Sequence, residues 1–591
     1  MLAPDDRSVL LDILRPPPEM RLDVAVATTF TLDLDAALVA PLAFAAFDAS
    51  GPGDPIAALE AIRSVADRLT IFCQAGEIRV PPHASDLFAF LEPVVHEVHR
   101  PRPGRLFHPK MWLLRYIGGN DEVVRLLAPT RNLTNDASWD AVLRLDGVPS
   151  GGPVSANRPV ADLIRWCMEH GVRSLSAERR AGLEGLVESV RRTHWDYPKD
   201  VQEIFFHALG VSTRTAPDFA GRRHLVISPF VTEGGLAIVA PSAGAVVISR
   251  PEQLEKLAPE VVDEIDCRVM TSVSADTDAN DASPLGALHA KVIVKEVGQR
   301  AHLFVGSPNA TDAAYGGNIE ILVELIGGRS ALGIDTLLGD LAKVLEPCQI
   351  MGGQVLSETE ELQVTLDELL REGAIATWQL SLTGQGDEGY LLDLSSQSAI
   401  VPAGMEVRAT LELLSRPGYA LEVPPGDPLE VSFGVVPIAD ITPFLVLRID
   451  LQGLMTSVSG STVVRAQLIG DPPGRFDAVI ARQVNSPAKF LRFLFLLLGI
   501  AGGGTPPWFQ TIDDQSGELG TTQLPALLEL GVFEALARAL ATNPTALDDL
   551  GRLVERLRTT DAGRSALPEG FDELWSAVTD ARSLSTQGTH P

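Results

Sequence analysis

The stretch that decides the fold is LHAKVIV at residues 288–294, followed by VGSPNAT at 305–311 and NIE at 318–320. It joins a histidine, a lysine, an asparagine and an acid through short apolar runs typical of buried strands. A second set in the same order lies upstream, with LFHPKMWLL at 106–114 and APTRNLT at 128–134. The asparagine follows the histidine by 24 positions upstream and by 20 downstream, and the acid follows by 32 and 31. This agreement indicates an internal duplication.

Each set supplies one histidine, one lysine, one asparagine and one acid as candidate site residues, and the second set adds a serine. The candidates are His108, Lys110, Asn132 and Asp140 in the first set, and His289, Lys291, Ser307, Asn309 and Glu320 in the second set. Imidazole can hold a phosphoryl group without a metal, and a second imidazole can protonate the leaving oxygen and then activate water. Lysine and asparagine stabilise charge on phosphate oxygens, and a carboxylate fixes the tautomer of a histidine.

On these residues the chain resembles the phospholipase D superfamily, whose pattern is His-x-Lys-x4-Asp followed by Gly-Ser-x-Asn. The resemblance covers roughly residues 20–345, and HAK, GSPN and NIE of the second set carry it most specifically. It implies an α/β fold, a duplicated α/β/α sandwich whose repeats pack around a pseudo-two-fold axis with both histidines in one cleft. It also implies that His108 is the nucleophile and His289 the general acid, with the swapped assignment left open.

The sequence departs from the family pattern at the aspartate five positions beyond each lysine, which is Arg115 in the first set and Glu296 in the second. Thr130 also stands where serine is usual. Loss of that aspartate is similar to the tyrosyl-DNA phosphodiesterases, and both His-Lys-Asn sets are intact. The resemblance therefore implies a metal-independent phosphodiesterase that needs no cofactor, a nuclease acting through a phosphohistidine. A phospholipid phosphodiesterase and a non-catalytic assembly subunit are the alternatives.

The net charge of −29 argues against tight, non-specific DNA binding over the whole surface, because counterion release drives such binding through basic side chains. A local basic groove remains compatible with that charge. Residues 96–116 hold five Lys or Arg against one acid, which makes Arg100, Arg102, Arg105 and Arg115 a candidate substrate rim, with a solvated loop as the alternative. The expected partners are nucleic acid, with DNA favoured over RNA, and a helicase, an ATPase or a second copy of the chain. The protein partners follow from an analogy with nucleases of phage-defence and DNA-repair systems.

The length of the chain and its pattern of expected strands and helices predict five segments. Alternating strands and helices indicate one α/β repeat at 1–150 and another at 216–350, joined by a helical connection at 151–215. Short β-runs broken by turns are typical of a β-rich accessory domain at 351–485, and 486–591 reads as helical. Within these segments, KDVQEIFFHALG at 199–210 is expected to be helical, and LAIVA at 236–240 is expected to be a strand.

The four cysteines are far apart and form no CxxC pair, so we expect reduced core thiols in a cytoplasmic protein. The first residues show no basic start followed by an apolar run, and no secretion signal is expected. The most hydrophobic run begins at Phe490, and its unbroken apolar part, 493–500, is far shorter than the roughly 20 residues that span a bilayer. We expect a buried helix there and no membrane partner.

Overall fold

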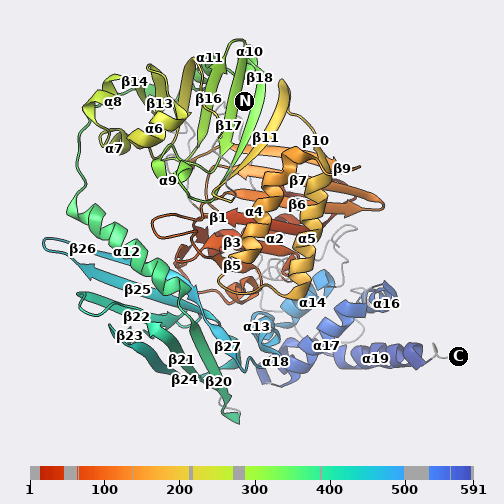
Figure 1. Cartoon of the computed structure of the whole chain (residues 1–591). Coiled ribbons are helices and arrows are strands. Elements are labelled where there is room, and N and C mark those ends of the chain that lie inside the picture. Colours follow the sequence, from red (N-terminus) through yellow and green to blue (C-terminus); the bar gives the residue numbers. More distant parts are fainter. Residues whose placement is uncertain are drawn as a thin grey trace.

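The computed structural model describes residues 13–44, 63, 65–135, 138–211, 217–270, 287–386, 389–497, 532–542, 544–559 and 561–587. These residues form a mixed α/β structure with several sheets and packed helices. Figure 1 shows a sheet unit in yellow and green above a second one in orange, with a β-rich unit in teal and a group of blue helices below them.

The first large sheet has seven strands. In spatial order they are β10 (Thr193–Trp195), β9 (Val142–Pro149), β7 (Asp121–Pro129), β6 (Met111–Gly118), β1 (Arg21–Thr29), β3 (Leu69–Gln74) and β5 (Val95–Val98). β1, β3 and β5 run parallel to one another. On the other side of β1, the neighbouring strands β6, β7, β9 and β10 alternate in direction, and β6 runs antiparallel to β1. The carboxyl ends of the parallel strands therefore meet at one edge, where the chain continues into loops.

The second large sheet has eight strands. They are β11 (Val201–Leu209), β18 (Glu320–Gly328), β17 (Arg300–Gly306), β16 (Val292–Val297), β12 (Arg223–Ile227), β13 (Ala245–Ile248), β14 (Ile265–Met270) and β19 (Leu345–Pro347). β12, β13 and β14 run parallel, whereas β16, β17, β18 and β11 follow as antiparallel neighbours. The order of parallel and antiparallel pairings is thus the same in both sheets, apart from β19, which pairs antiparallel with β14 and has no counterpart in the first sheet.

Side chains of each strand point alternately to the two faces of the first sheet, and helices pack against both faces. Val24 and Val26 of β1 share a core with α4 (Arg158–Glu169) and α5 (Ala177–Arg192), and this core continues to the second sheet. Ala25 and Ala27 face the other way, toward α2 (Leu34–Phe44). The shorter helices of the second sheet unit are α6 (Glu233–Val239), α7 (Pro251–Leu254), α8 (Pro259–Asp263), α9 (Asp312–Tyr315), α10 (Arg329–Leu332) and α11 (Ile334–Leu341).

Two predictions of secondary structure are wrong. The segment 199–210 contains β11, which pairs with β18 along its length. The described part of the predicted connection at 151–215 is therefore helical in α4, α5 and one 3-10 turn at Ser155–Asn157, and not in 199–210. The apolar spacing of 199–210 also fits a helix, but Phe205 and Phe206 favour a strand and a free sheet edge is available. LAIVA lies in α6 instead of a strand, because Thr232 caps the helix by accepting a hydrogen bond from Gly235 N at 3.1 Å.

The third unit contains two four-stranded sheets that share a core with one long helix, α12 (Glu358–Ile375). One sheet is β24 (Pro428–Val436), β21 (Tyr390–Ala399), β20 (Trp378–Gly384) and β27 (Gln467–Ile469), and the other is β23 (Leu421–Val423), β22 (Val407–Leu413), β25 (Phe444–Gln452) and β26 (Ser457–Arg465). A capping box of Ser357 and Glu360 starts α12. Figure 1 shows α12 running from the second sheet unit down to the third unit.

The C-terminal part is helical where it is described. Its helices are α13 (Arg475–Gln483), α14 (Pro487–Leu497), α16 (Val532–Thr542), α17 (Pro544–Arg558), α18 (Asp561–Ala566) and α19 (Phe571–Gln587). Phe490 and Phe493 are buried in α14, as predicted, whereas residues 498–500 of the same run lie outside the described residues. No described helix combines the length and the apolar content that crossing a bilayer needs.

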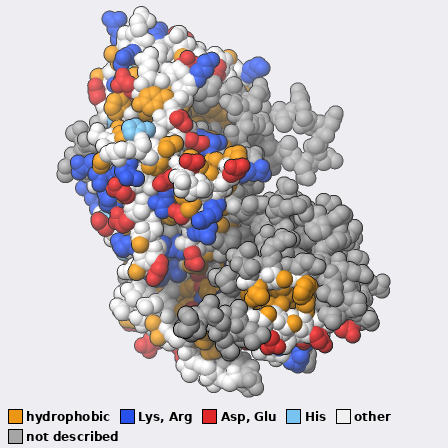
Figure 2. Space-filling model, turned by 90° about the vertical axis from the view of Figure 1, so that its right-hand side faces the viewer, with side chains coloured by type: hydrophobic (Ala, Val, Ile, Leu, Met, Phe, Trp, Pro, Cys, Tyr) orange, Lys and Arg blue, Asp and Glu red, His pale blue; other side chains and the backbone are white. Residues whose placement is uncertain are grey.

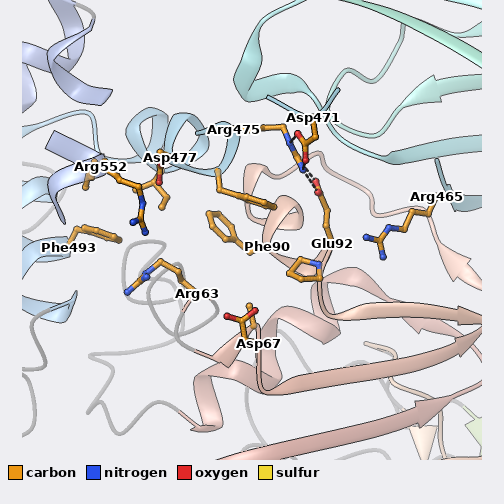
Figure 3. A pocket seen from close by; sticks show the side chains of 15 residues that line it. Arg63, Asp67, Phe90, Glu92, Arg465, Asp471, Arg475, Asp477, Phe493 and Arg552 are labelled. Atoms are coloured by element: carbon orange, nitrogen blue, oxygen red, sulfur yellow. Dashed lines mark hydrogen bonds and ion pairs between the residues drawn. The ribbon is translucent and has the colours of Figure 1, made fainter. Parts of the chain in front are cut away.

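A cavity of about 460 Å³ lies at the junction of the first sheet unit, the third unit and these helices (Figure 3). At its wall Arg475 of α13 donates to both carboxylate oxygens of Glu92, at 2.8 and 2.7 Å, and both residues are 3% exposed. Arg465, at the end of β26, points toward Glu92 in Figure 3 and donates to the carbonyl of Val95 at 3.0 Å. One buried ion pair and one hydrogen bond from an arginine to a backbone carbonyl thus join three parts of the chain that are far apart in sequence.

Candidate functional site

The acid of the second set lies beside the histidine of the first set. Phe107 and Ile319 form a parallel β-bridge. His108 N donates to Ile319 O at 2.9 Å, and Ile319 N donates to Leu106 O at 2.9 Å. His108 and Glu320 each follow a bridged residue, so the backbone pairing brings their side chains together.

The same arrangement occurs with the roles of the two sets exchanged. β15 (Ala287–Leu288) pairs in parallel with β8 (Ser138–Trp139), and Leu288 lies opposite Trp139. His289 N donates to Trp139 O at 2.8 Å. His289 and Asp140 each follow a paired residue, so the first set's acid stands beside the second set's histidine. The sequence spacing alone did not indicate which acid serves which histidine.

His108 is held in one tautomer by buried acceptors. Its Nδ1 lies 2.9 and 3.0 Å from the two carboxylate oxygens of Glu320, which is 0% exposed. Ser307 Oγ donates to the same carboxylate, and Asn318 Nδ2 donates to it at 3.3 Å. Because the carboxylate accepts the proton of Nδ1, the lone pair of the imidazole is on Nε2. Burial lowers the pKa of His108 to about 4, although Glu320 opposes that shift, so Nε2 is a free base at neutral pH.

Two lysines are buried next to this imidazole. Lys110 Nζ lies 2.9 Å from His108 Nε2 and 3.1 Å from His108 O. Lys291 Nζ donates to Thr130 O at 3.0 Å and to His289 O at 2.9 Å. Burial lowers the pKa of Lys110 well below its ordinary value, with Lys291 adding to the shift, and it lowers the pKa of Lys291 to about 7. Such a pair of poorly solvated amines is suited to an anion that would restore their charge.

The hydroxyl residues before the asparagines occupy matching places in the two sets. Thr130 Oγ1 donates to Ala141 O at 3.1 Å and accepts from Ala141 N at 2.9 Å. Ser307 Oγ accepts from Ile321 N at 2.9 Å, where Ile321 directly follows Glu320. Thr130 is therefore the structural counterpart of Ser307, so the unusual threonine keeps the same turn.

Each of the two asparagines has a buried polar atom that a ligand could satisfy. Among the described residues, Asn132 Oδ1 and Asn309 Oδ1 are buried without a hydrogen-bond partner. Oxygen and nitrogen of an amide are interchangeable by a flip of the side chain, so each group can equally present its NH₂. A buried amide that lacks a partner is costly unless a ligand satisfies it, which fits a role in binding phosphate oxygens.

Phe30, which the sequence did not indicate, forms a wall of the site. It directly follows β1, and its ring centroid lies 5.1 Å from that of His108 with the planes tilted by 56°. Lys110 Nζ lies 5.9 Å from the same ring centroid. β1 pairs with β6, and His108 precedes β6, so only the strand pairing shows that these residues meet.

The predicted arginine rim divides into two groups. Arg102 donates to Gly316 O at 2.9 Å, beside the loop that leads to Glu320, and Arg105 lies next to the same glycine. Arg100 instead binds two carboxylates of α12. Arg115 lies within β6, about 20 Å along the chain from His108, and donates to Asp23 at 2.7 Å. The rim prediction therefore needs correction at Arg100 and Arg115, whose charges are engaged by acids.

A cavity of about 390 Å³ adjoins the first set. Asn132 and Asp140 line it together with Arg131, and Trp112 and Val39 supply an apolar wall. Within the described residues, no group of three or more His, Cys, Asp or Glu side chains is arranged to hold a metal ion. Cys73, Cys167 and Cys267 are buried, as predicted, whereas Cys348 is half-buried and does not belong to the core.

Neither the known family models nor the curated proteins give a match to this chain. Among solved structures, the chain is similar to the phosphatidylserine synthase of Haemophilus influenzae Rd KW20, with 8% sequence identity and a TM-score of 0.31. The match covers 62% of this chain and 89% of the synthase. At that score and identity, the likeness assigns neither a family nor an activity to this protein.

Proposed function

We propose that this protein is a phospholipase D-like phosphodiesterase with a duplicated α/β/α sandwich, and that it cleaves nucleic acid without a metal. The observation that carries the proposal is the pairing of His108 with Glu320 across the two sets, next to two buried lysines. Six strands in matching order, β9-β7-β6-β1-β3-β5 in one sheet and β18-β17-β16-β12-β13-β14 in the other, support the duplication.

In the proposed reaction, His108 Nε2 attacks the phosphorus and forms a phosphorus–nitrogen bond while the ester bond to the leaving oxygen breaks. His289 donates a proton to that oxygen. It then removes a proton from water, whose oxygen attacks the phosphorus and breaks the phosphorus–nitrogen bond, which regenerates His108. Lys110, Lys291, Asn132 and Asn309 stabilise the charge on the phosphate oxygens.

Nucleic acid is the proposed substrate because Arg102 and Arg105 lie beside the loop that carries Glu320. The net charge of −29 gives little support to non-specific binding. Figure 2 shows basic and acidic side chains intermingled on one face of the sheet units. A local site with a few phosphate contacts therefore fits this chain better than an extended basic track.

The test is cleavage in EDTA of single-stranded DNA, double-stranded DNA, RNA and phosphatidylcholine vesicles by the purified chain. We expect nucleic acid cleavage that His108→Ala and His289→Ala abolish, with His194→Ala, an exposed histidine of β10, as the matched control. A covalent adduct should accumulate in His289→Ala and be absent from His108→Ala. An adduct on His289 would make His289 the nucleophile and His108 the general acid. Cleavage of lipid alone would make phospholipid the substrate in place of nucleic acid. Activity that survives both substitutions would refute the site.

A further inference from the structure

A hydroxyl side chain holds the turn after β1 against the segment that carries the first asparagine. Thr29 Oγ1 donates to Thr31 O at 2.7 Å. The same hydroxyl accepts from Leu133 N at 2.9 Å, directly after Asn132. Thr31 is buried, with 8% of its surface exposed. In the first set, this turn therefore presents a small buried side chain next to the site.

The turn after β12 is built in the same way but carries a different side chain. Ser228 Oγ donates to Phe230 O at 2.7 Å and accepts from Ala310 N at 3.0 Å, directly after Asn309. Phe230 is therefore the counterpart of Thr31. Its side chain is large and apolar, and yet 40% of its surface is exposed. The turn itself does not require an aromatic residue, because the first set closes the same hydrogen bonds with a threonine.

The loops after β3 and β13 differ between the two sets in a similar way. Gln74 and Arg250 stand at the same position, counted along β3 and β13 from their pairing with β1 and β12. Gln74 Oε1 accepts from Phe107 N at 2.8 Å, whereas Arg250 donates from Nε and Nη2 to Leu288 O at 3.2 and 3.0 Å. Phe107 and Leu288 each directly precede the histidine of their set. A neutral amide is thus sufficient for this contact in the first set, and the second set has a cation instead.

The two side chains that distinguish the second set contact each other. Arg250 Cζ lies 5.1 Å from the ring centroid of Phe230, which is within the range of a cation–π contact. Arg250 is half-buried, and no acid among the described residues forms an ion pair with it. Its backbone contact lies next to His289, and the turn of Phe230 is bonded next to Asn309. A cation and an exposed aromatic ring therefore stand together beside two of the candidate site residues.

This combination of side chains is the one that binds a nucleotide without reading its sequence. Every base has a π-face that can stack on an aromatic ring, and a guanidinium binds the phosphate of the backbone. A single exposed phenylalanine is common on protein surfaces. Phe230 differs from such residues because it lies beside the candidate site, against an arginine, at a position where the other set has a buried threonine.

We propose that Phe230 and Arg250 form a subsite for the nucleotide next to the scissile phosphate, in which an unpaired base stacks on Phe230 and the adjoining phosphate binds Arg250. A base that stacks on a protein ring has left the stack of its own duplex, so the substrate class is single-stranded nucleic acid. This inference rests on the proposed function for the position of the scissile phosphate.

The first test compares cleavage of an oligothymidylate with cleavage of an abasic tetrahydrofuran oligomer of the same length, in EDTA. The two substrates carry the same phosphates, and only the first carries bases. The wild type should have a kcat/KM about tenfold higher for the oligothymidylate, and pairing with a complementary strand should slow its cleavage. Phe230→Leu should lower kcat/KM for the oligothymidylate to the level of the abasic oligomer, whereas Phe230→Trp should keep the preference. Phe205→Leu is the matched control, because Phe205 is also 40% exposed but lies on β11, opposite Glu324.

The second test changes Arg250 to glutamine, the residue at the matching position of the first set. Glutamine can still donate a hydrogen bond to Leu288 O, so the backbone before His289 keeps its contact. Arg250→Gln should lower kcat/KM for both oligomers. It should also reduce the slope of log kcat/KM against log salt by about 0.7, which is the contribution of one phosphate contact on a single strand. An unchanged slope would show a merely structural role and would overturn the assignment of Arg250.

Binding of a fluorescein-labelled oligothymidylate, measured by anisotropy in EDTA, separates this inference from the proposed function. If the wild type binds the oligomer but cleaves none of the substrates, the proposed function fails, while a weaker affinity of Phe230→Leu still supports the subsite. Equal affinity and equal kcat/KM of Phe230→Leu and the wild type for oligothymidylate would overturn the inference. A wild type that does not distinguish the oligothymidylate from the abasic oligomer would overturn it as well.

Discussion

Replacing Glu320 by glutamine tests the centre of the proposed site with the smallest change of shape. The carboxylate accepts the Nδ1 proton of His108, the hydroxyl proton of Ser307 and one proton of Asn318. Glutamine keeps the size of the side chain but removes its charge, so the imidazole loses a charged acceptor in a fully buried position.

The expected loss follows from the strength of one hydrogen bond. A hydrogen bond to a charged group contributes about 1.5–3 kcal/mol. If that contribution is realised as His108 becomes positively charged in the transition state, kcat falls by roughly 10- to 150-fold. KM should change little, because Glu320 binds His108 and does not itself face the phosphate oxygens. Glu320 also favours the protonated imidazole, so in its absence the pKa of His108 falls below its present value of about 4.

The assay is steady-state hydrolysis of bis(p-nitrophenyl) phosphate in EDTA at pH 7, with the acid limb of kcat/KM measured at high salt. Activity requires neutral His108 and is lost as the pH falls through its pKa, so Glu320→Gln should move that limb to lower pH while reducing the plateau. Glu324→Gln is the matched control, since it lies four residues further along β18 and binds His207 and His302. Wild-type kcat in Glu320→Gln, or an acid limb that moves upward, would refute the reasoning.

Three further predictions concern the rest of the site and the junction in Figure 3. Asn132→Ala and Asn309→Ala should each weaken tungstate binding without lowering Tm. A buried amide oxygen without a partner costs about 1–3 kcal/mol of stability in the ligand-free protein, so its removal should not destabilise the fold. A clear drop in Tm would count against a ligand-binding role. Burial lowers the pKa of Lys291 to about 7, and the amine loses its charge above that pH. Tungstate affinity should therefore decline from pH 7 to pH 9, and Lys291→Arg should make this decline shallower. Parallel curves of affinity against pH for the two proteins would contradict this explanation. Arg475→Met should reduce the free energy of unfolding in urea by about 3–5 kcal/mol, because the buried carboxylate of Glu92 loses the cation that binds it. Adding Glu92→Gln should recover part of this loss. Equal stability of the single and double variants would show that loss of the ion pair is not the cause.

Most of the strands could be predicted from the sequence because their local pattern agrees with their final environment. β1, β16, β17 and β18 are short runs of apolar and β-branched residues, and the last three end at a glycine or directly before one. β11 could not be predicted in this way, since its apolar spacing fits a helix and its partner, β18, lies more than a hundred residues away. LAIVA was wrongly predicted as a strand because its β-branched residues favour one, whereas the hydrogen bond from Gly235 N to the Thr232 side chain starts a helix there.

The sequence by itself determined the composition of the candidate site: two histidines, two lysines, two asparagines and two acids in repeated order. These residues follow from chemistry, because each type has a separate task at a phosphate, and the repeat makes chance agreement improbable. The tertiary structure decided which of them meet. Glu320 binds His108 because a bridge between the two sets brings them together, and Phe30 covers the imidazole. These contacts depend on pairing between distant segments, and local sequence carries no signal for a partner that only long-range packing brings near.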